Sequence, residues 1–193
     1  MEKVSEALIA SYEDAALPLD VRRQVDALEA QAWPQSPAVP PHSHDPLLKP
    51  VAMVMLVDGR VVSSLAILSK DIVHQGIRFA ASGLSAVVTD QAVRKRGYGH
   101  SLVTAGKQAI RASGADLGIF TCDEPLLGFY ESAGWELLPG TSLIGGTQQV
   151  PLPSDLFGKV TVALFFTEHA QRHAASFVGA RVELYPGEID RLW

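Results

Sequence analysis

The sequence Val87-Val-Thr-Asp-Gln-Ala-Val-Arg-Lys-Arg-Gly-Tyr-Gly99 joins the end of an apolar run to the start of a helical pattern. The apolar run predicts a strand over residues 77–89, and apolar residues at helical spacing predict a helix over 97–113. The first N–H groups of a helix lack intrahelical acceptors, and the helix dipole adds positive charge there. Glycines and arginine side chains beside such N–H groups predict a site for phosphate.

The segments around this junction predict the rest of the fold. Two-residue turns at Asp58-Gly59 and Gln75-Gly76 predict a meander of three strands. Gly83, inside the third strand, indicates a bulge or a close backbone approach. The expected elements are a helix over 19–33, a proline-rich loop over 34–50, strands over 51–57, 61–73 and 77–89, the helix over 97–113, a strand over 117–122, a helix ending at Gly134, a strand over 135–138, a long loop over 139–158, a strand over 160–167 and a short helix or turn over 168–177. This order predicts an α/β (α+β) domain with a mixed sheet.

Composition narrows the classes of function. A chain of 193 residues fits one domain, and its net charge of −5 argues against nucleic acid as a partner. The sequence contains no apolar run of the ~18 residues that a membrane span needs. The first 20 residues lack the layout of a secretory signal, so we expect a cytoplasmic protein with no membrane partner. On an acidic chain, the cluster Arg94, Lys95 and Arg96 indicates a specific anion site.

Single residues suggest other chemistry less strongly. Cys122 is the only cysteine, which excludes an intrachain disulfide, and we expect a buried structural thiol rather than a nucleophile. His42 and His44 suggest a metal site, but two imidazoles alone rarely hold a metal, so we expect a solvated loop and no metal. His74, beside a hairpin turn, is expected at the surface.

Two segments carry a resemblance to a known family. Val87 through Gly99 and the later Phe129-Tyr-Glu-Ser-Ala-Gly-Trp135 together resemble the GNAT superfamily of acyl-CoA-dependent N-acetyltransferases over roughly 50–167. The resemblance implies a mixed, mostly antiparallel central sheet flanked by helices. It implies a single acyl-CoA N-acyltransferase domain over 1–193, in which 168–193 form an extension near the acceptor site. Members of this superfamily often form dimers, so a homodimer is allowed.

The same resemblance implies a cosubstrate and a reaction. Acetyl-CoA would donate its acetyl group by direct transfer to a primary amine of a small, cationic molecule. Tyr130 would protonate the leaving thiolate, although a core aromatic beside Phe129 is the alternative. N–H groups near Val87 and Val88 would polarise the thioester carbonyl. The residues implied to bind acetyl-CoA are Val87, Val88, Thr89, Arg94, Lys95, Arg96, Gly97, Tyr98, Gly99 and His100.

Within the superfamily, the chain is similar to the aminoglycoside 2′-N-acetyltransferase branch. The similarity lies in Ser64–Lys70, His74–Ile77, Gly140–Ser142 and the final tryptophan. In that branch, acids and the terminal carboxylate meet a cationic sugar. The groups implied for this role are Asp155, Asp190 and the Trp193 carboxylate, with Asp123 as a further acid whose alternative role is helix capping.

One departure from the branch leaves the general base open. Ser85 stands where the branch has a glutamate, and a serine cannot act as that base. Asp123, Glu124 or a chain of water molecules could take the proton instead. A catalytically degenerate CoA-binding module is therefore the alternative function.

Overall fold

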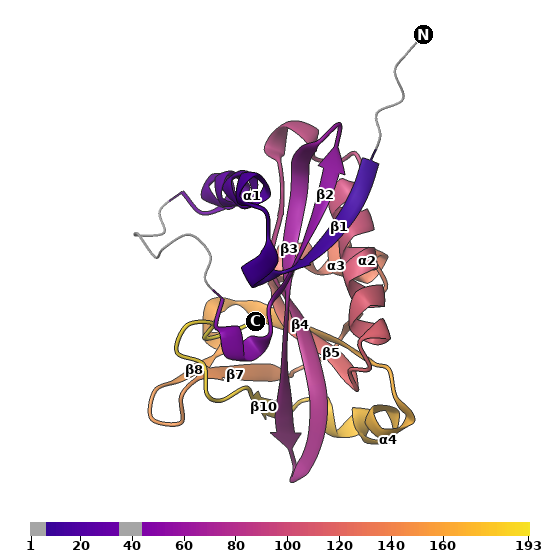
Figure 1. The fold of residues 1–193 in the computed structure, drawn as a ribbon. Coiled ribbons are helices and arrows are strands. Elements are labelled where there is room, and N and C mark those ends of the chain that lie inside the picture. Colours follow the sequence, from indigo (N-terminus) through magenta and orange to yellow (C-terminus); the bar gives the residue numbers. More distant parts are fainter. Residues whose placement is uncertain (1–6, 35–43) are drawn as a thin grey trace.

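The structure is a computed structural model that describes residues 7–34 and 44–193 (Figure 1). Its elements follow the expected alternation of a meander with later helices and strands. In chain order they are β1 (Ala7–Glu13), α1 (Leu19–Ala32), β2 (Val51–Val57), β3 (Arg60–His74), β4 (Ile77–Thr89), α2 (Tyr98–Ala112), β5 (Leu117–Asp123), α3 (Leu127–Ser132), β6 (Glu136–Leu137), β7 (Ser142–Gly146), β8 (Pro151–Pro153), β9 (Lys159–Phe165), α4 (Glu168–Phe177) and β10 (Arg181–Glu183).

A central sheet organises these elements. Over the described residues, its strand order is β1-β2-β3-β4-β5-β9-β6, and a smaller sheet has the order β10-β7-β8. In the central sheet only the β4–β5 pair is parallel, while the other neighbours are antiparallel. The predicted mixed, mostly antiparallel sheet flanked by helices is confirmed.

The meander β2–β3–β4 turns where the sequence predicts. Asp58 and Gly59 both have positive φ angles, of 50° and 78°, and Gln75 and Gly76 repeat these values. Two central residues with positive φ match the right-handed twist of the flanking strands. The long strands that result bring the end of β4 to the start of α2.

Helices cover both faces of the central sheet (Figure 1). On one face, Val21 and Val25 of α1 pack with a cluster that includes Val54 and Val88. On the other face, α2 lies close to the strands at Gly106, where an added Cβ would come within 3.3 Å of Leu65 and Leu84. None of the helices in the described parts of the chain combines the length and apolar character needed to cross a bilayer.

The prediction of a long loop over 139–158 is wrong. This stretch contains β7, β8 and a short 3₁₀ helix, Ser154–Phe157. Its glycines provide space for close packing: a Cβ on Gly145 would collide with the backbone oxygen of Arg191. A strand that needs glycine for such an approach resembles a loop in sequence, because glycine is otherwise depleted in strands.

Two further features differ from expectation. His74 is buried rather than at the surface, because its Nε2 lies 2.9 Å from the carbonyl oxygen of Ser176 and its ring packs on Phe177. The C-terminal segment, for which no strand was predicted, contains β10 and ends at the buried Trp193. It is held by Lys70, whose Nζ donates hydrogen bonds to three successive carbonyl oxygens, those of Leu184, Tyr185 and Pro186.

Gly83 lies at the centre of this packing. A Cβ at this position would overlap the Trp193 ring and come within 2.6 Å of the carbonyl oxygen of Ile119. The sequence predicted either a bulge or a close backbone approach at Gly83, and the structure shows the close approach. The bulge in β4 occurs three residues later, at Ala86.

We predict that Gly83→Ala lowers the free energy of unfolding by about 1–3 kcal/mol, because the backbone of β5 cannot move away cheaply. Gly128→Ala is the matched control, since a Cβ on this α3 residue would meet nothing within 4 Å. Alanine favours a helix over glycine, so this control should be neutral or stabilising by up to about 1 kcal/mol. Urea unfolding of the two variants checks the contrast, and equal stabilities would contradict it.

Candidate functional site

The central sheet opens between β4 and β5. The two parallel strands pair only at Ala81–Leu117 and Ser82–Gly118, and no later residues of β4 and β5 pair in the described chain. Beyond this point β5 pairs with β9 on its other side, as far as Asp123. A gap between the carboxyl ends of parallel strands is where open α/β sheets bind ligands.

The β4 side of this gap carries a β-bulge. On β3 and β4, Ser64 pairs with Val88 and Ala66 pairs with Ser85, so β4 contains one residue more than β3 over this interval. Ala86 takes up the difference with a φ of 49°. A bulge breaks the ladder of hydrogen bonds and redirects peptide groups, which makes the Ala86–Val87 region able to present N–H groups to a ligand.

The strand–helix junction predicted to bind phosphate begins α2. Gly97 is the N-cap residue of α2, with φ of 85°, and a Cβ there would meet nothing within 4 Å. Lys95 also has a positive φ, of 66°. Gly99, by contrast, is buried, and a Cβ there would come within 2.6 Å of Thr89 Oγ1. Gly97 therefore leaves the helix N-terminus open, and Gly99 lets it approach β4.

The charges at this junction are uncompensated. Arg94 Nε donates to the Thr89 carbonyl oxygen at 3.3 Å, and no carboxylate of the described residues forms an ion pair with Arg94, Lys95 or Arg96. Asp90, the acid in the same turn, is 3% exposed and is held by Arg60 at 2.5 Å. Three exposed cations beside free helix N–H groups fit a polyphosphate.

Tyr130 of α3 lies near the other side of the gap. It is 6% exposed, and its ring packs edge-on against Phe120 and Phe129. Burial raises the pKa of Tyr130 far above its ordinary value, and negative charge at Cys122 and Asp123 raises it further. The phenol thus keeps its proton at neutral pH, as a proton donor must.

Side chains of α2 hold the end of α3. His100 Nε2 lies 2.9 Å from the Ser132 carbonyl oxygen, and Lys107 Nζ donates to the Ala133 carbonyl oxygen at 2.6 Å. His100, predicted to flank phosphates, therefore contacts the carboxyl end of α3 in this structure. A cation at a helix C-terminus satisfies carbonyl groups that have no intrahelical donor.

The predicted acceptor-binding residues have separate partners. Asp123 pairs with Lys159 at 2.7 Å, and Asp155 lies 3.7 Å from Arg181. Asp190 accepts hydrogen bonds from His44 and the Asp45 N–H. The backbone oxygen of Trp193 accepts from both the N–H and the hydroxyl of Thr121, two residues before Asp123. Among the described residues, no hydrogen bond or ion pair joins these four groups to one another.

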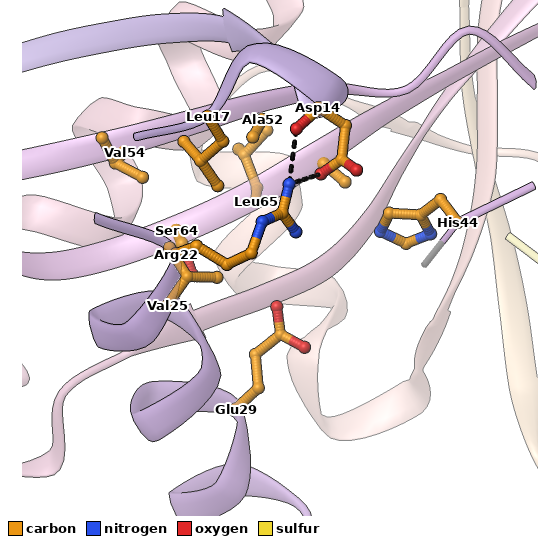
Figure 2. A pocket seen from close by; sticks show the side chains of 11 residues that line it. Asp14, Leu17, Arg22, Val25, Glu29, His44, Ala52, Val54, Ser64 and Leu65 are labelled. Atoms are coloured by element: carbon orange, nitrogen blue, oxygen red, sulfur yellow. Dashed lines mark hydrogen bonds and ion pairs between the residues drawn. The ribbon is translucent and has the colours of Figure 1, made fainter. Parts of the chain in front are cut away.

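A pocket that the sequence did not reveal opens between α1 and the β2–β3 strands (Figure 2). Its empty space is about 330 Å³ when the open solvent at its mouth is counted. Its lining combines apolar side chains with the polar residues Asp14, Arg22, Glu29, His44 and Ser64. Ser64 Oγ is buried and has no hydrogen-bond partner in the described chain. No local sequence pattern indicates this pocket, because its residues come from three separate segments.

Metal ligands are not grouped in the described residues: no three His, Cys, Asp or Glu side chains there could hold an ion. Of the histidine pair considered above, His42 lies outside the described residues. His44 bonds to Asp190 at 2.7 Å instead of to a metal.

Comparisons with known proteins agree with this geometry. A family model described as an acetyltransferase (GNAT) domain matches residues 20–138, more than half of the chain. The GNAT family N-acetyltransferase YhbS from Escherichia coli, solved with CoA, is 18% identical, with a TM-score of 0.60 over 95% of this chain and 92% of that one. A GNAT family acetyltransferase from Brucella melitensis, solved with acetyl-CoA, is 16% identical, with a TM-score of 0.56 over 84% and 89%.

A larger protein contains a similar fold. An Enterococcus faecalis protein of unknown function is 14% identical, with a TM-score of 0.57 over 69% of this chain, which spans only 33% of the larger protein. Identities this low show the shared fold alone. A search among curated protein sequences found no match.

We predict that Cys122 is unreactive in the folded protein. Burial raises the pKa of its thiol to about 11, and only the thiolate attacks an alkylating reagent. Iodoacetamide at pH 8 should therefore label the folded chain at least ten times more slowly than the chain in urea, and folded-state labelling should accelerate as pH rises toward 11. Mass spectrometry measures both rates. Equal rates would mean that the thiol is accessible and ionised.

Proposed function

Because the chain belongs to the GNAT acetyltransferase family, we propose that it moves the acetyl group of acetyl-CoA directly to a primary amine of a small, cationic molecule. One observation carries the proposal: three unpaired cations and an open helix N-terminus stand beside the gap between β4 and β5. We further propose a cytoplasmic location, and a homodimer is compatible with the proposal.

Acetyl-CoA would lie with its pyrophosphate on the start of α2 and its pantetheine arm in the gap. Backbone N–H groups of Gly97, Tyr98 and Gly99 would face the phosphates, and Arg94, Lys95 and Arg96 would add charge. His100 would stay beside this end of the ligand. Val87, Val88 and Thr89 would line the arm, as extended backbone does for an added strand-like ligand.

The chemistry follows from the groups at the gap. The amine nitrogen attacks the thioester carbonyl carbon, and N–H groups at the β4 bulge polarise the carbonyl oxygen. The C–S bond then breaks, and the CoA thiolate takes the proton of the Tyr130 phenol. The amide nitrogen loses its extra proton to solvent, and solvent restores the phenol proton. The Tyr130 phenol is protonated at neutral pH, and burial raises its pKa further above the ordinary value.

The acceptor class rests on the acidic groups that the family resemblance assigns to the acceptor. Asp123, Asp155 and Asp190, with Trp193, would draw a cationic molecule toward the acetyl group. Aminoglycoside-like amines belong to this class. The lysine and arginine partners of Asp123 and Asp155 would exchange for ligand ammonium groups, since both pairs are solvent-exposed.

A CoA-binding module without turnover is the second candidate function. It is favoured by Ser85, which stands beside the β4 bulge where a carboxylate base is expected. Such a module would bind acetyl-CoA through the same turn and release no thiol with any amine.

Gly97→Glu should abolish acetyl-CoA binding, because its carboxylate would occupy the open space at the helix start and repel phosphate. Gly59→Glu is the matched control: it has a similar positive φ, of 78°, and equally open surroundings, but lies in the β2–β3 turn. We expect a loss of affinity of at least 100-fold by calorimetry for the first variant and less than twofold for the second. Unchanged affinity in Gly97→Glu would exclude this turn as the binding site.

Tyr130→Phe should lower kcat about 100-fold or more, the usual contribution of a proton donor, and change acetyl-CoA affinity less than twofold. Release of free CoA would be measured with kanamycin, spermidine and ethylamine as acceptors. A raised phenol pKa predicts that Tyr130 itself causes no fall in rate between pH 7 and 9. Wild-type protein that binds acetyl-CoA and releases thiol with none of the three amines would favour the binding module.

A further inference from the structure

A histidine–carboxylate pair lies beside the α1 pocket. His44 Nδ1 is 2.7 Å from Asp190 Oδ1, and the Asp45 N–H donates to the other oxygen, Oδ2, also at 2.7 Å. The two side chains are only 12% and 13% exposed. They are 146 positions apart in the sequence, so the folded C-terminal segment brings them together.

This contact fixes which nitrogen of the ring is free. An ionised carboxylate can only accept a hydrogen bond, so Nδ1 of His44 carries the proton that faces Asp190. In the neutral ring, Nε2 is then a proton acceptor. Figure 2 shows the ring at the edge of the pocket, with a nitrogen on the side that faces Arg22. The pocket therefore has a positioned base at its edge.

The same pocket adjoins the place where the thioester would react. Ser64 and Ala66 of β3 form part of its wall, and their partners on β4 are Val88 and Ser85, which flank the bulge at Ala86. Neighbouring strands are about 4.8 Å apart. An amine in the pocket would thus lie within about one strand spacing of the bulge. The unpartnered Ser64 Oγ could accept a hydrogen bond from it.

Charged groups around His44 come from several elements. Asp14 and Glu29 line the pocket with it, and Arg22 pairs with Asp14 at 3.2 Å. Asp45 adjoins His44 in sequence, and Lys70 holds the carbonyl groups of the segment that carries Asp190. Carboxylates outnumber cations at the pocket, so it favours an entering ammonium group.

We propose that this pocket receives the acceptor amine and that His44 is the general base that Ser85 cannot be, with Asp190 as its positioning residue. The inference rests on the proposed acetyl transfer. The ammonium proton passes to Nε2 of His44, the neutral amine forms the N–C bond as the C–S bond breaks, and Tyr130 gives its proton to the CoA thiolate. The new amide nitrogen then loses its second proton to solvent. The imidazolium then returns its proton to solvent, and solvent restores the phenol proton.

His44→Gln should lower kcat/KM for the best of the three test amines at least 100-fold at pH 7, with acetyl-CoA affinity changed less than twofold. The wild-type rate should fall on the acid side as the imidazole is protonated, and this fall should be absent in the variant. Asp190→Ala should lose about tenfold or more, and Asp190→Glu should recover part of that loss. His173→Gln, on α4, is the matched histidine control and should stay within twofold of wild type.

A spectroscopic measurement tests the geometry without turnover. Nitrogen-15 correlation spectra of the imidazole rings should show neutral His44 with its proton on Nδ1, and Asp190→Ala should weaken that preference. A proton on Nε2 would overturn the proposal, as would a His44→Gln variant that keeps both wild-type kcat/KM and the acid-side fall. A His44→Gln variant of that kind would overturn only the role of His44, and the proposed acetyl transfer would be unaffected. Wild-type protein that binds acetyl-CoA but acetylates none of the amines would defeat the proposed transfer and the base together.

Discussion

The early end of pairing between β4 and β5 is the constraint on which the site depends. Two parallel strands that stay hydrogen-bonded along their length leave no room for a ligand between them. Here the pairing stops at Ser82–Gly118, and the next residue of β4, Gly83, lets the Trp193 ring lie against the strand. Trp193 thereby contacts both strands, with its ring against Gly83 of β4 and its backbone oxygen bonded to Thr121 of β5, while β4 carries a bulge further on. In the proposed chemistry, the β4 bulge, the start of α2 and Tyr130 of α3 all act at this opening.

The two reactants would approach from different faces of the central sheet. The turn proposed to bind phosphate begins α2, which packs on the face bearing Leu65 and Leu84. The pocket with His44 lies under α1, which packs on the opposite face with Val54 and Val88. A sheet with a gap lets groups from both faces meet, and separate faces keep the cationic turn away from the acidic pocket. In the proposed reaction, this arrangement would let one small domain attract a polyanion and a cation without either charge neutralising the other.

Local patterns account for the parts of the fold that were predicted. The Asp-Gly and Gln-Gly turns set the meander, and the junction at Gly97–Gly99 located the helix start, because each depends on backbone conformations that few residue types adopt. The strands β1, β7, β8 and β10 were missed, since their pairing partners or packing neighbours lie far along the chain. The contact between His44 and Asp190 could not be predicted for the same reason. His74 was misplaced because a residue beside a hairpin turn can still be covered by a distant helix, here α4.

The bonds that His100 and Lys107 make to the end of α3 have a mechanical consequence. Each hydrogen bond links a side chain of α2 to a carbonyl group at the end of α3, the helix that bears Tyr130. The separation between the start of α2 and the phenol is therefore set by side chains of α2 rather than by the connecting segments. In the proposed complex, a thioester that contacts both the start of α2 and Tyr130 would therefore need a phosphate-to-sulfur length that matches the separation of these two helices.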